Sequence, residues 1–334
     1  MKATALIDWL TFTVRDWGDD YASVIREYLQ MDVDLFTQCP FGRYRYRYAV
    51  EYNNITVYFG GAEDSGGSAS GLSMGVCVVM SGNGCRTFEE NSGITFITLL
   101  SKLLDEYNYD NRSVNITRID IAVDDKSGSI SIGRMLDYIR KRQVNTRLRK
   151  VDEHKSYDLG NPVEDDAIGF YLGSPKSEFR YRIYDKAKQQ DDYDSHWVRI
   201  ELVSKSDYAI GAAEKLVKFG EERIGQTVAG MIRETLLFIE NDNERVERCS
   251  VAEWWDDFLE MVTAIKFLNR EKPVQSADKI YFWLEEQISR SLAMAHEIWG
   301  DDFVFGIIDK GKREMKPNQR AIVRDYIRNE RMTA

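Results

Sequence analysis

Three segments of the chain place most of their charged residues at alternate positions, and this pattern constrains the fold more than any other. They are residues 115–124, 179–186 and 197–202. Because successive side chains of a strand point to opposite faces of a sheet, each segment has one polar and one apolar face. Such strands are typical of an antiparallel sheet that is packed on one side and solvated on the other. We therefore predict an α+β protein built on an antiparallel sheet.

The first 210 residues contain further strand signals. Residues 5–14, 72–80 and 167–172 are rich in β-branched and aromatic side chains. The spacing of apolar residues predicts helices over 21–29, 94–107 and 132–142. Residues 43–48 alternate Arg and Tyr and could pair with 55–59 across Asn53-Asn54 as a hairpin. The hairpin would then carry a basic face of Arg43, Arg45 and Arg47.

From about residue 211 the sequence favours long amphipathic helices. Apolar spacing predicts them over 254–268, 276–299 and 318–331. The stretch from Asp309 onward carries eight basic against four acidic residues and includes Lys312 and Arg313. We predict a β-rich catalytic domain over 1–210 and a helical region over 211–334 that recognises DNA or binds a partner.

Composition limits the possible functions. The 334 residues carry a net charge of −10, which repels a polyanion and argues against a purely electrostatic DNA binder. No apolar run is long enough for a membrane helix and the start lacks a secretion signal, so we expect a cytoplasmic protein without membrane contact. The three histidines are far apart in sequence, so any metal would be held by carboxylates.

The polar faces of the three alternating segments hold a group of residues that could carry chemistry. If the strands share one sheet, that face collects carboxylates, a tyrosine and several cations, which suits a phosphate. The alternative is a solvent-exposed sheet face on which Arg and Glu form cross-strand ion pairs and have no catalytic role. The residues are Arg118, Asp120 and Asp124, then Arg180, Arg182, Tyr184 and Lys186, then Arg199 and Glu201.

The functional interpretation assigns a role to each type of side chain. Asp120 and Glu201 supply hard oxygen ligands for Mg²⁺ or Mn²⁺. Tyr184 would be the nucleophile. A phenol has an unperturbed pKa near ~10, so we expect the metal and Arg182 or Lys186 to favour the phenolate.

Five blocks of the sequence carry a family resemblance. They are IDWL at 7–10, SGNGCR at 81–86, TRIDIAVDD at 117–125, RIYDK at 182–186 and WVRIEL at 197–202. In this order they resemble successive blocks of the Rep_trans replication initiation factor family, which includes rolling-circle plasmid initiators and nicking relaxases of conjugative elements. Taken alone, the glycines of 82–86 predict only a turn.

The resemblance implies a fold and a mechanism. The fold would be a saddle-shaped antiparallel sheet with repeats like those of the TATA-binding protein, followed by a mainly helical C-terminal part. Tyr184 would cut one origin strand and form a 5′-phosphotyrosine, assisted by Arg182 and Lys186. The metal, Mg²⁺ or Mn²⁺, would be held by Asp120, Glu201 and Asp124, with Asp8 in reserve.

Partners also follow from the resemblance. We expect origin DNA with a single-stranded or hairpin nick site, a host superfamily 1 helicase, and a homodimer. The expected DNA contacts are Arg43, Arg45, Arg47, Arg180, Arg199, Lys312 and Arg313. Two other functions stay open on the residues alone: a non-catalytic, sequence-specific DNA-binding regulator, and a carboxylate metallohydrolase acting on a small phosphate ester.

Overall fold

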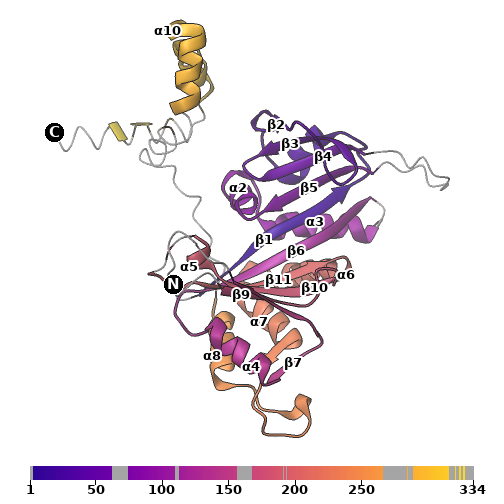
Figure 1. Ribbon diagram of the computed structural model, residues 1–334. Helices are drawn as coiled ribbons and strands as arrows, with labels where there is room; N and C mark the ends of the chain where they lie inside the picture. Colours follow the sequence, from indigo (N-terminus) through magenta and orange to yellow (C-terminus); the bar gives the residue numbers. More distant parts are fainter. Residues whose placement is uncertain are drawn as a thin grey trace. The chain divides into compact units, whose positions relative to one another are not determined.

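The computed structural model describes most of the chain. The described residues are 3–61, 74–109, 113–155, 168–190, 192, 194–265, 284, 289–315, 320, 323–324 and 326–327. They form an α+β protein (Figure 1). The chain divides into two compact units, Met1–Leu268 and Asn269–Ala334.

The first unit is built on one large antiparallel sheet with the strand order β2-β3-β4-β5-β1-β6-β11-β10-β9-β8. A second small sheet pairs β12 with β7. The strands are β1 (Ala3–Val14), β2 (Thr37–Gln38), β3 (Tyr46–Tyr52), β4 (Ile55–Gly61), β5 (Val76–Ser81), β6 (Val114–Asp125), β7 (Val144–Thr146), β8 (Val151–Lys155), β9 (Ile168–Leu172), β10 (Phe179–Asp185), β11 (Val198–Lys205) and β12 (Leu236–Phe238).

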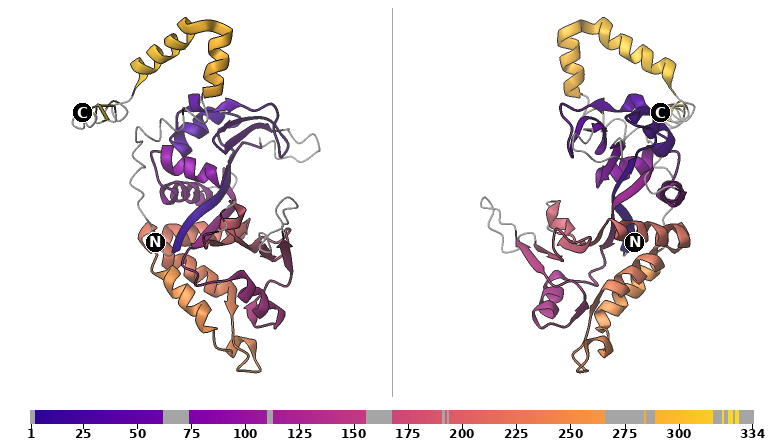
Figure 2. Two further views of the ribbon diagram at one scale, coloured as in Figure 1. Left: turned by 60° about the vertical axis from the view of Figure 1, so that its left-hand side comes forward. Right: turned by 90° about the vertical axis from the view of Figure 1, so that its right-hand side faces the viewer.

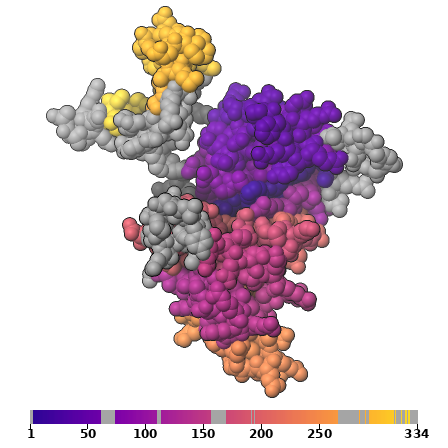
Figure 3. Space-filling model, viewed as in Figure 1, coloured from indigo at the N-terminus to yellow at the C-terminus, as the bar shows by residue number. Residues whose placement is uncertain are grey.

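The strand order repeats on the two sides of the sheet centre. Outward from β1 lie β5, β4, β3 and β2, and outward from β6 lie β11, β10, β9 and β8 in the same succession. The two halves adjoin along the long pairing of β1 with β6 (Figure 2). On the molecular surface the indigo first half borders the magenta second half (Figure 3). This two-half antiparallel sheet with a mainly helical C-terminal part confirms the predicted fold class.

Several helices pack on the apolar face of the sheet. The helices are α1 (Tyr21–Val24), α2 (Asn83–Asn91), α3 (Phe96–Tyr109), α4 (Ile132–Arg140), α5 (Lys186–Gln189), α6 (Asp207–Phe219), α7 (Ile224–Thr235), α8 (Glu253–Thr263) and α10 (Ser289–Glu314), with a π-helical turn at η1 (Ile25–Leu29) and 3₁₀ turns at η2 (Val33–Leu35), η3 (Glu221–Arg223) and η4 (Val246–Arg248). No described helix is both long and apolar enough to cross a membrane.

The main core lies between the sheet and the helices. Tyr181 and Ile183 of β10, with Ile200 and Leu202 of β11, are buried in this core together with the apolar sides of α3, α6 and α7. The alternate residues of the same strands must therefore face the other side of the sheet. The alternation in the sequence predicted this division correctly.

Most predicted elements are confirmed, with two corrections. The strand predicted from Arg43 begins only at Tyr46, because Tyr44 and Arg45 have positive φ angles of 56° and 71° and form a turn. The predicted turn at 82–86 is instead the start of α2, with Gly82 preceding its first residue.

The helical region falls partly outside the described residues. Helices α6, α7 and α8 lie in the same compact unit as the sheet, which extends to Leu268. Of the helix predicted over 276–299, residues 289–299 belong to α10, and Leu284 is also described. Most of the helix predicted over 318–331 lies outside the described residues.

Candidate active site

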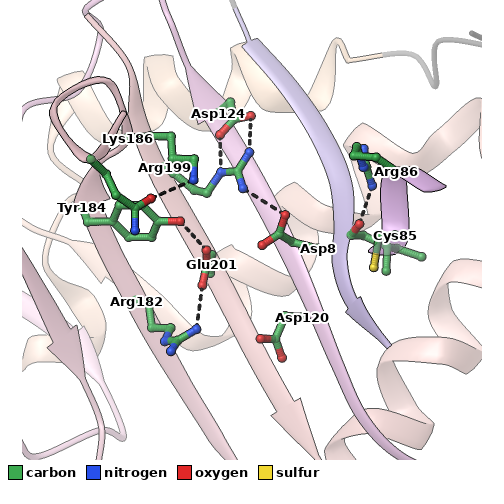
Figure 4. A network of polar contacts seen from close by, with 12 residues as sticks. Asp8, Cys85, Arg86, Asp120, Asp124, Arg182, Tyr184, Lys186, Arg199 and Glu201 are labelled. Carbon is green, nitrogen blue, oxygen red and sulfur yellow. Dashed lines mark hydrogen bonds and ion pairs between the residues drawn. The ribbon is translucent and has the colours of Figure 1, made fainter. Parts of the chain in front are cut away.

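The polar face of the second half of the sheet brings the predicted residues together. Strand β11 lies between β6 and β10, and its register places Arg199 opposite both Asp124 and Tyr184. Glu201 lies opposite Arg182. Figure 4 shows these side chains meeting on one face, as the alternation predicted.

Tyr184 and Glu201 form the centre of this group. The Tyr184 hydroxyl donates to Oε1 of Glu201 at 2.6 Å, and Nη1 of Arg182 contacts Oε2 at 3.3 Å. The Glu201 side chain is only 4% exposed. A buried carboxylate with two donors is well placed to hold the phenol in one orientation and to accept its proton.

The surroundings of the phenol favour its protonated form. Burial, followed by the neighbouring Glu201 carboxylate, raises the pKa of Tyr184 above its usual value. The neighbouring cations alone do not offset these two effects in this structure, and the predicted help of a metal stays a prediction. Lys186 donates to Gln189, and its Nζ lies 5.8 Å from the Tyr184 ring centroid. Burial also raises the pKa of Glu201.

Arg199 links two carboxylates from different halves of the sheet. Its Nε and Nη2 donate to the two oxygens of Asp124 at 2.7 and 2.9 Å, and its Nη1 donates to Oδ1 of Asp8 at 2.9 Å. The Arg199 side chain is 8% exposed. Instead of lying open to DNA, as predicted, this arginine is engaged as a buried cross-link.

Asp120 lies on the same face beside Arg118. The Arg118 guanidinium makes two hydrogen bonds to the Asp120 carboxylate, at 2.9 and 2.6 Å, and stacks over Trp9 at 3.9 Å from the ring centroid. Burial raises the pKa of Asp120, although the Arg118 contact opposes this shift. Asp120 is thus a buried carboxylate held by a partly exposed cation.

The predicted metal ligands do not form a ready coordination site. Within the described ranges, no three acidic, histidine or cysteine side chains are arranged to hold a metal ion. Asp124 gives both oxygens to the buried Arg199, whereas Asp120 gives its two to Arg118, whose side chain is 21% exposed. Asp120 is therefore easier to release for a cation than Asp124.

The predicted DNA-contacting residues occupy three regions. Arg180 lies on β10 beside Arg182, and its Nε is buried without a hydrogen-bond partner in the described part of the chain. Burial, and then repulsion from Arg182, lowers the pKa of Arg180. The remaining predicted contacts are exposed: Arg43, Arg45 and Arg47 at and before β3, and Lys312 and Arg313 at the end of α10.

Two residues around the site were not predicted as part of it. Trp9 stacks under Arg118, and Arg86 donates to the backbone of β1 next to Asp8. The sequence gives a weak indication for Trp9, because Trp9, Thr11 and Thr13 occupy alternate positions of one strand, which predicts a shared polar face. For Arg86 the sequence gives no indication beyond its place in the 81–86 block, because its contact is with Ile7 of β1, a strand far away in sequence.

Comparisons with known proteins agree with this architecture. Residues 114–308 match the family model described as Replication initiation factor, and residues 4–102 match the Rolling Circle replication initiation protein N-terminal domain. A Bacillus subtilis (strain 168) protein named as DNA relaxase NicK is 27% identical over 265 residues, covering 76% of this chain and 70% of that protein.

A solved structure is also similar. The rolling circle replication initiator protein from Geobacillus stearothermophilus superposes with a TM-score of 0.68 and 26% identity, over 79% of this chain and 98% of that one. The first family model alone covers more than half of the chain, including Asp120, Tyr184 and Glu201. The chain therefore belongs to the replication initiation factor family.

Proposed function

We propose that this chain is a site-specific single-strand DNA endonuclease and strand transferase. It nicks an origin through a covalent 5′-phosphotyrosine at Tyr184 and so initiates rolling-circle replication or conjugative transfer. The observation that carries this proposal is the 2.6 Å hydrogen bond from the Tyr184 hydroxyl to the buried Glu201 carboxylate. Similarity to proteins named as a relaxase and as a rolling circle initiator supports the substrate.

The reaction is a transesterification. The Tyr184 oxygen attacks a backbone phosphorus and its proton passes to Glu201, while the bond from phosphorus to the 3′ oxygen breaks. The 3′ oxygen leaves as a hydroxyl after taking a proton from solvent. Because one phosphate ester replaces another, religation needs no nucleotide, and the free 3′ end can prime a polymerase.

Cations on the same face would stabilise the charge that develops on the phosphate. Arg182 already contacts Glu201, and Arg180 and Lys186 lie on the same strand or directly after it. When the Tyr184 proton moves to Glu201, the carboxyl becomes neutral and Arg182 is free to turn toward the phosphate. A role for Arg182 at that moment explains why a cation is placed beside the proton acceptor.

The donor set suits a hard divalent cation. Glu201, Asp120 and Asp8 supply carboxylate oxygens. Burial first, and then the nearby charges of Asp8 and Asp120, raise the pKa of Glu201, so a cation among these carboxylates would be attracted. Because they form no ready coordination site in this structure, we propose that these three hold Mg²⁺ or Mn²⁺ once Arg118 and Arg182 release Asp120 and Glu201, and that Asp124 stays paired with Arg199. A bound cation would supply charge stabilisation for the attacked phosphate and the leaving oxygen.

The partners follow from the family. We propose that the substrate is origin DNA with a single-stranded or hairpin nick site, that the chain acts as a homodimer, and that it loads a host superfamily 1 helicase. Sedimentation of the full chain tests the dimer, and it is refuted if only monomer sediments at micromolar concentration. Co-purification with the helicase on nicked origin DNA tests the loading.

One experiment tests the nicking function. Supercoiled plasmid carrying the DNA that flanks the coding sequence is incubated with the full chain, with Mg²⁺ or with excess EDTA. We expect a nick only with the metal, and mass spectrometry should find the nucleotide on the Tyr184 peptide. Tyr184→Phe removes one oxygen, so it should fold and bind DNA but form no adduct, a loss of at least about 10³-fold.

A matched control and the competing functions give the other outcomes. Tyr171→Phe removes a hydroxyl from the neighbouring strand β9, where the ring lies near Arg182, and should leave the adduct intact. Binding without any nick would favour the DNA-binding regulator. Hydrolysis of a small phosphate ester without an adduct would favour the metallohydrolase.

A further inference from the structure

The connection from β5 to α2 is attached to the backbone of β1 at the point where β1 enters the site. Gly82 has a φ angle of 45°, a conformation that favours glycine. In this conformation its amide donates to the carbonyl oxygen of Asp8 at 2.7 Å. The glycine therefore fixes one backbone group of β1.

Arg86 fixes the adjacent group. Its Nη2 donates to the carbonyl oxygen of Ile7 at 2.6 Å, and the same nitrogen lies 3.0 Å from the Glu89 carboxylate. Two consecutive carbonyls of β1 are thus bound by residues 82–86, which we call the β1 clamp. Figure 4 shows Arg86 on the side of β1 away from the Tyr184 site.

The clamp coincides with a bulge in β1. The register of β1 with β6 shifts between Ile7, opposite Ile121, and Trp9, opposite Asp120. In a regular strand Ile7 and Trp9 would share a face, yet Ile7 is buried in the main core and Trp9 stacks with Arg118 on the polar face. Asp8 is the extra residue that this change of face requires.

The bulge delivers Asp8 to the site. Its Oδ1 accepts from Arg199, and in the described part of the chain its other oxygen accepts no hydrogen bond. Asp8 comes from the first half of the sheet, whereas Tyr184, Arg199 and Glu201 come from the second half. The site is therefore composite, and the carboxylate that β1 contributes depends on an irregular piece of backbone.

The second half of the sheet offers an internal comparison. Ser206, at φ 49°, occupies the place of Gly82 after β11, and its amide donates to the Thr117 carbonyl of β6 at 3.1 Å. Four residues later this half has Ile210, whereas the first half has Arg86. The backbone contact is thus common to both halves, and the arginine contact is particular to the half that supplies Asp8.

We propose that Arg86, together with the Gly82 amide, is a positioning group that holds the β1 bulge so that Asp8 serves the nicking site. The inference deepens the proposed function and rests on it. It predicts that Arg86 acts only through Asp8, which a purely structural arginine would not do. Positioning partners of this kind typically change metal affinity or activity by about 10- to 100-fold.

The test is a double-mutant cycle on the full chain with Arg86→Met, Asp8→Asn and both changes together. Adduct formation on a single-stranded oligonucleotide and Mn²⁺ affinity by electron paramagnetic resonance are the two measurements. Each single variant should lose about tenfold or more in both. The double variant should lose no more than Asp8→Asn alone, and Arg86→Lys should retain more activity than Arg86→Met.

The control is Arg233→Met, which removes another partly buried, ion-paired arginine, paired with Asp256 and Glu260 on the helices. It should leave adduct formation unchanged. If Arg86→Met does not fold, Gly82→Ala and Glu89→Gln, which weaken the same clamp, take its place in the cycle.

Two outcomes would overturn the inference. One is that the clamp variants behave like wild type. The other is that the double variant loses the product of the two single losses instead of the Asp8→Asn loss alone. If the wild-type chain forms no adduct, the proposed function fails. The Mn²⁺ affinity, which needs no DNA, then still decides whether Arg86 acts through Asp8.

Discussion

At the scale of single residues, the site is a set of buried carboxylates, each held by a cation or a hydroxyl. Glu201 has Tyr184 and Arg182, Asp120 has Arg118, and Asp124 has Arg199. Desolvation raises the pKa of both Asp120 and Glu201, so these groups carry a free-energy cost when ionised. Such a cost is expected where charges are kept for chemistry rather than for stability.

This cost makes a prediction about Glu201→Gln. The folded-state pKa of Glu201 lies above its unfolded value of 4.5, so the folded state binds protons more tightly. Its contribution to stability is fully present below that value and is lost as the pH rises through the folded pKa. The loss amounts to about 1.4 kcal/mol for each unit of elevation. Glutamine does not ionise, so the Glu201→Gln variant does not lose this stability as the pH rises.

Urea unfolding of both proteins between pH 4 and pH 8 is the measurement. The stability of Glu201→Gln relative to wild type, measured as the difference in free energy of unfolding, should increase as the pH rises. A difference that is constant, or that falls with pH, would show that Glu201 is not destabilised by burial. Nicking by the wild type should rise with pH over the same window, because only the ionised carboxylate accepts the Tyr184 proton.

At the scale of elements, the hairpin of β3 and β4 separates what the sequence predicts from what it cannot. The turn at Asn53-Asn54 was predicted and is confirmed, with φ angles of 42° and 67° that suit asparagine in such turns. The alternation of Arg and Tyr from Arg43 predicted a strand that starts too early, because β3 begins only at Tyr46. A Cβ on Gly42 would lie 2.1 Å from the Tyr46 carbonyl oxygen, so the chain folds back tightly there and cannot extend as a strand.

The hairpin turn gives a second prediction. Asn54→Ala places a side chain that tolerates positive φ poorly at 67°, and it should cost about 1 kcal/mol of unfolding free energy. Asn54→Gly keeps the preferred turn sequence and should be neutral or slightly stabilising. Thermal and urea unfolding of the two variants provide the comparison. Equal stabilities would mean that the turn conformation is not strained for alanine.

At the scale of the whole molecule, the site depends on registers that join distant segments. Alternation places Asp120, Tyr184 and Glu201 each on the polar side of its own strand, and it predicted a shared face on the condition that the three strands lie in one sheet. It could not predict that Arg199 is buried between two carboxylates, or that a bulge turns Asp8 inward. Those features arise from the pairing of β1 with β6 and of β6 with β11.

The division into two units leads to the last prediction. The first unit, ending at Leu268, contains every residue of the candidate site, whereas Lys312 and Arg313 belong to the second. Chemistry on a phosphate is the same at any sequence, so origin preference must come from other contacts. A chain that ends at Leu268 should therefore form the adduct on a single-stranded oligonucleotide at a rate similar to that of the full chain. It should lose at least about tenfold of its preference for origin over scrambled duplex.

Competition binding and adduct assays with both chains measure the two quantities. The matched control is the full chain with both Lys312→Gln and Arg313→Gln. If both residues contact phosphates, the affinity for origin DNA falls and the salt dependence of binding decreases by about two contacts. The preference for origin over scrambled DNA should stay the same. A shortened chain that still discriminates origin from scrambled duplex as well as the full chain would place recognition on the sheet, where the exposed Arg43, Arg45 and Arg47 would be the next residues to replace.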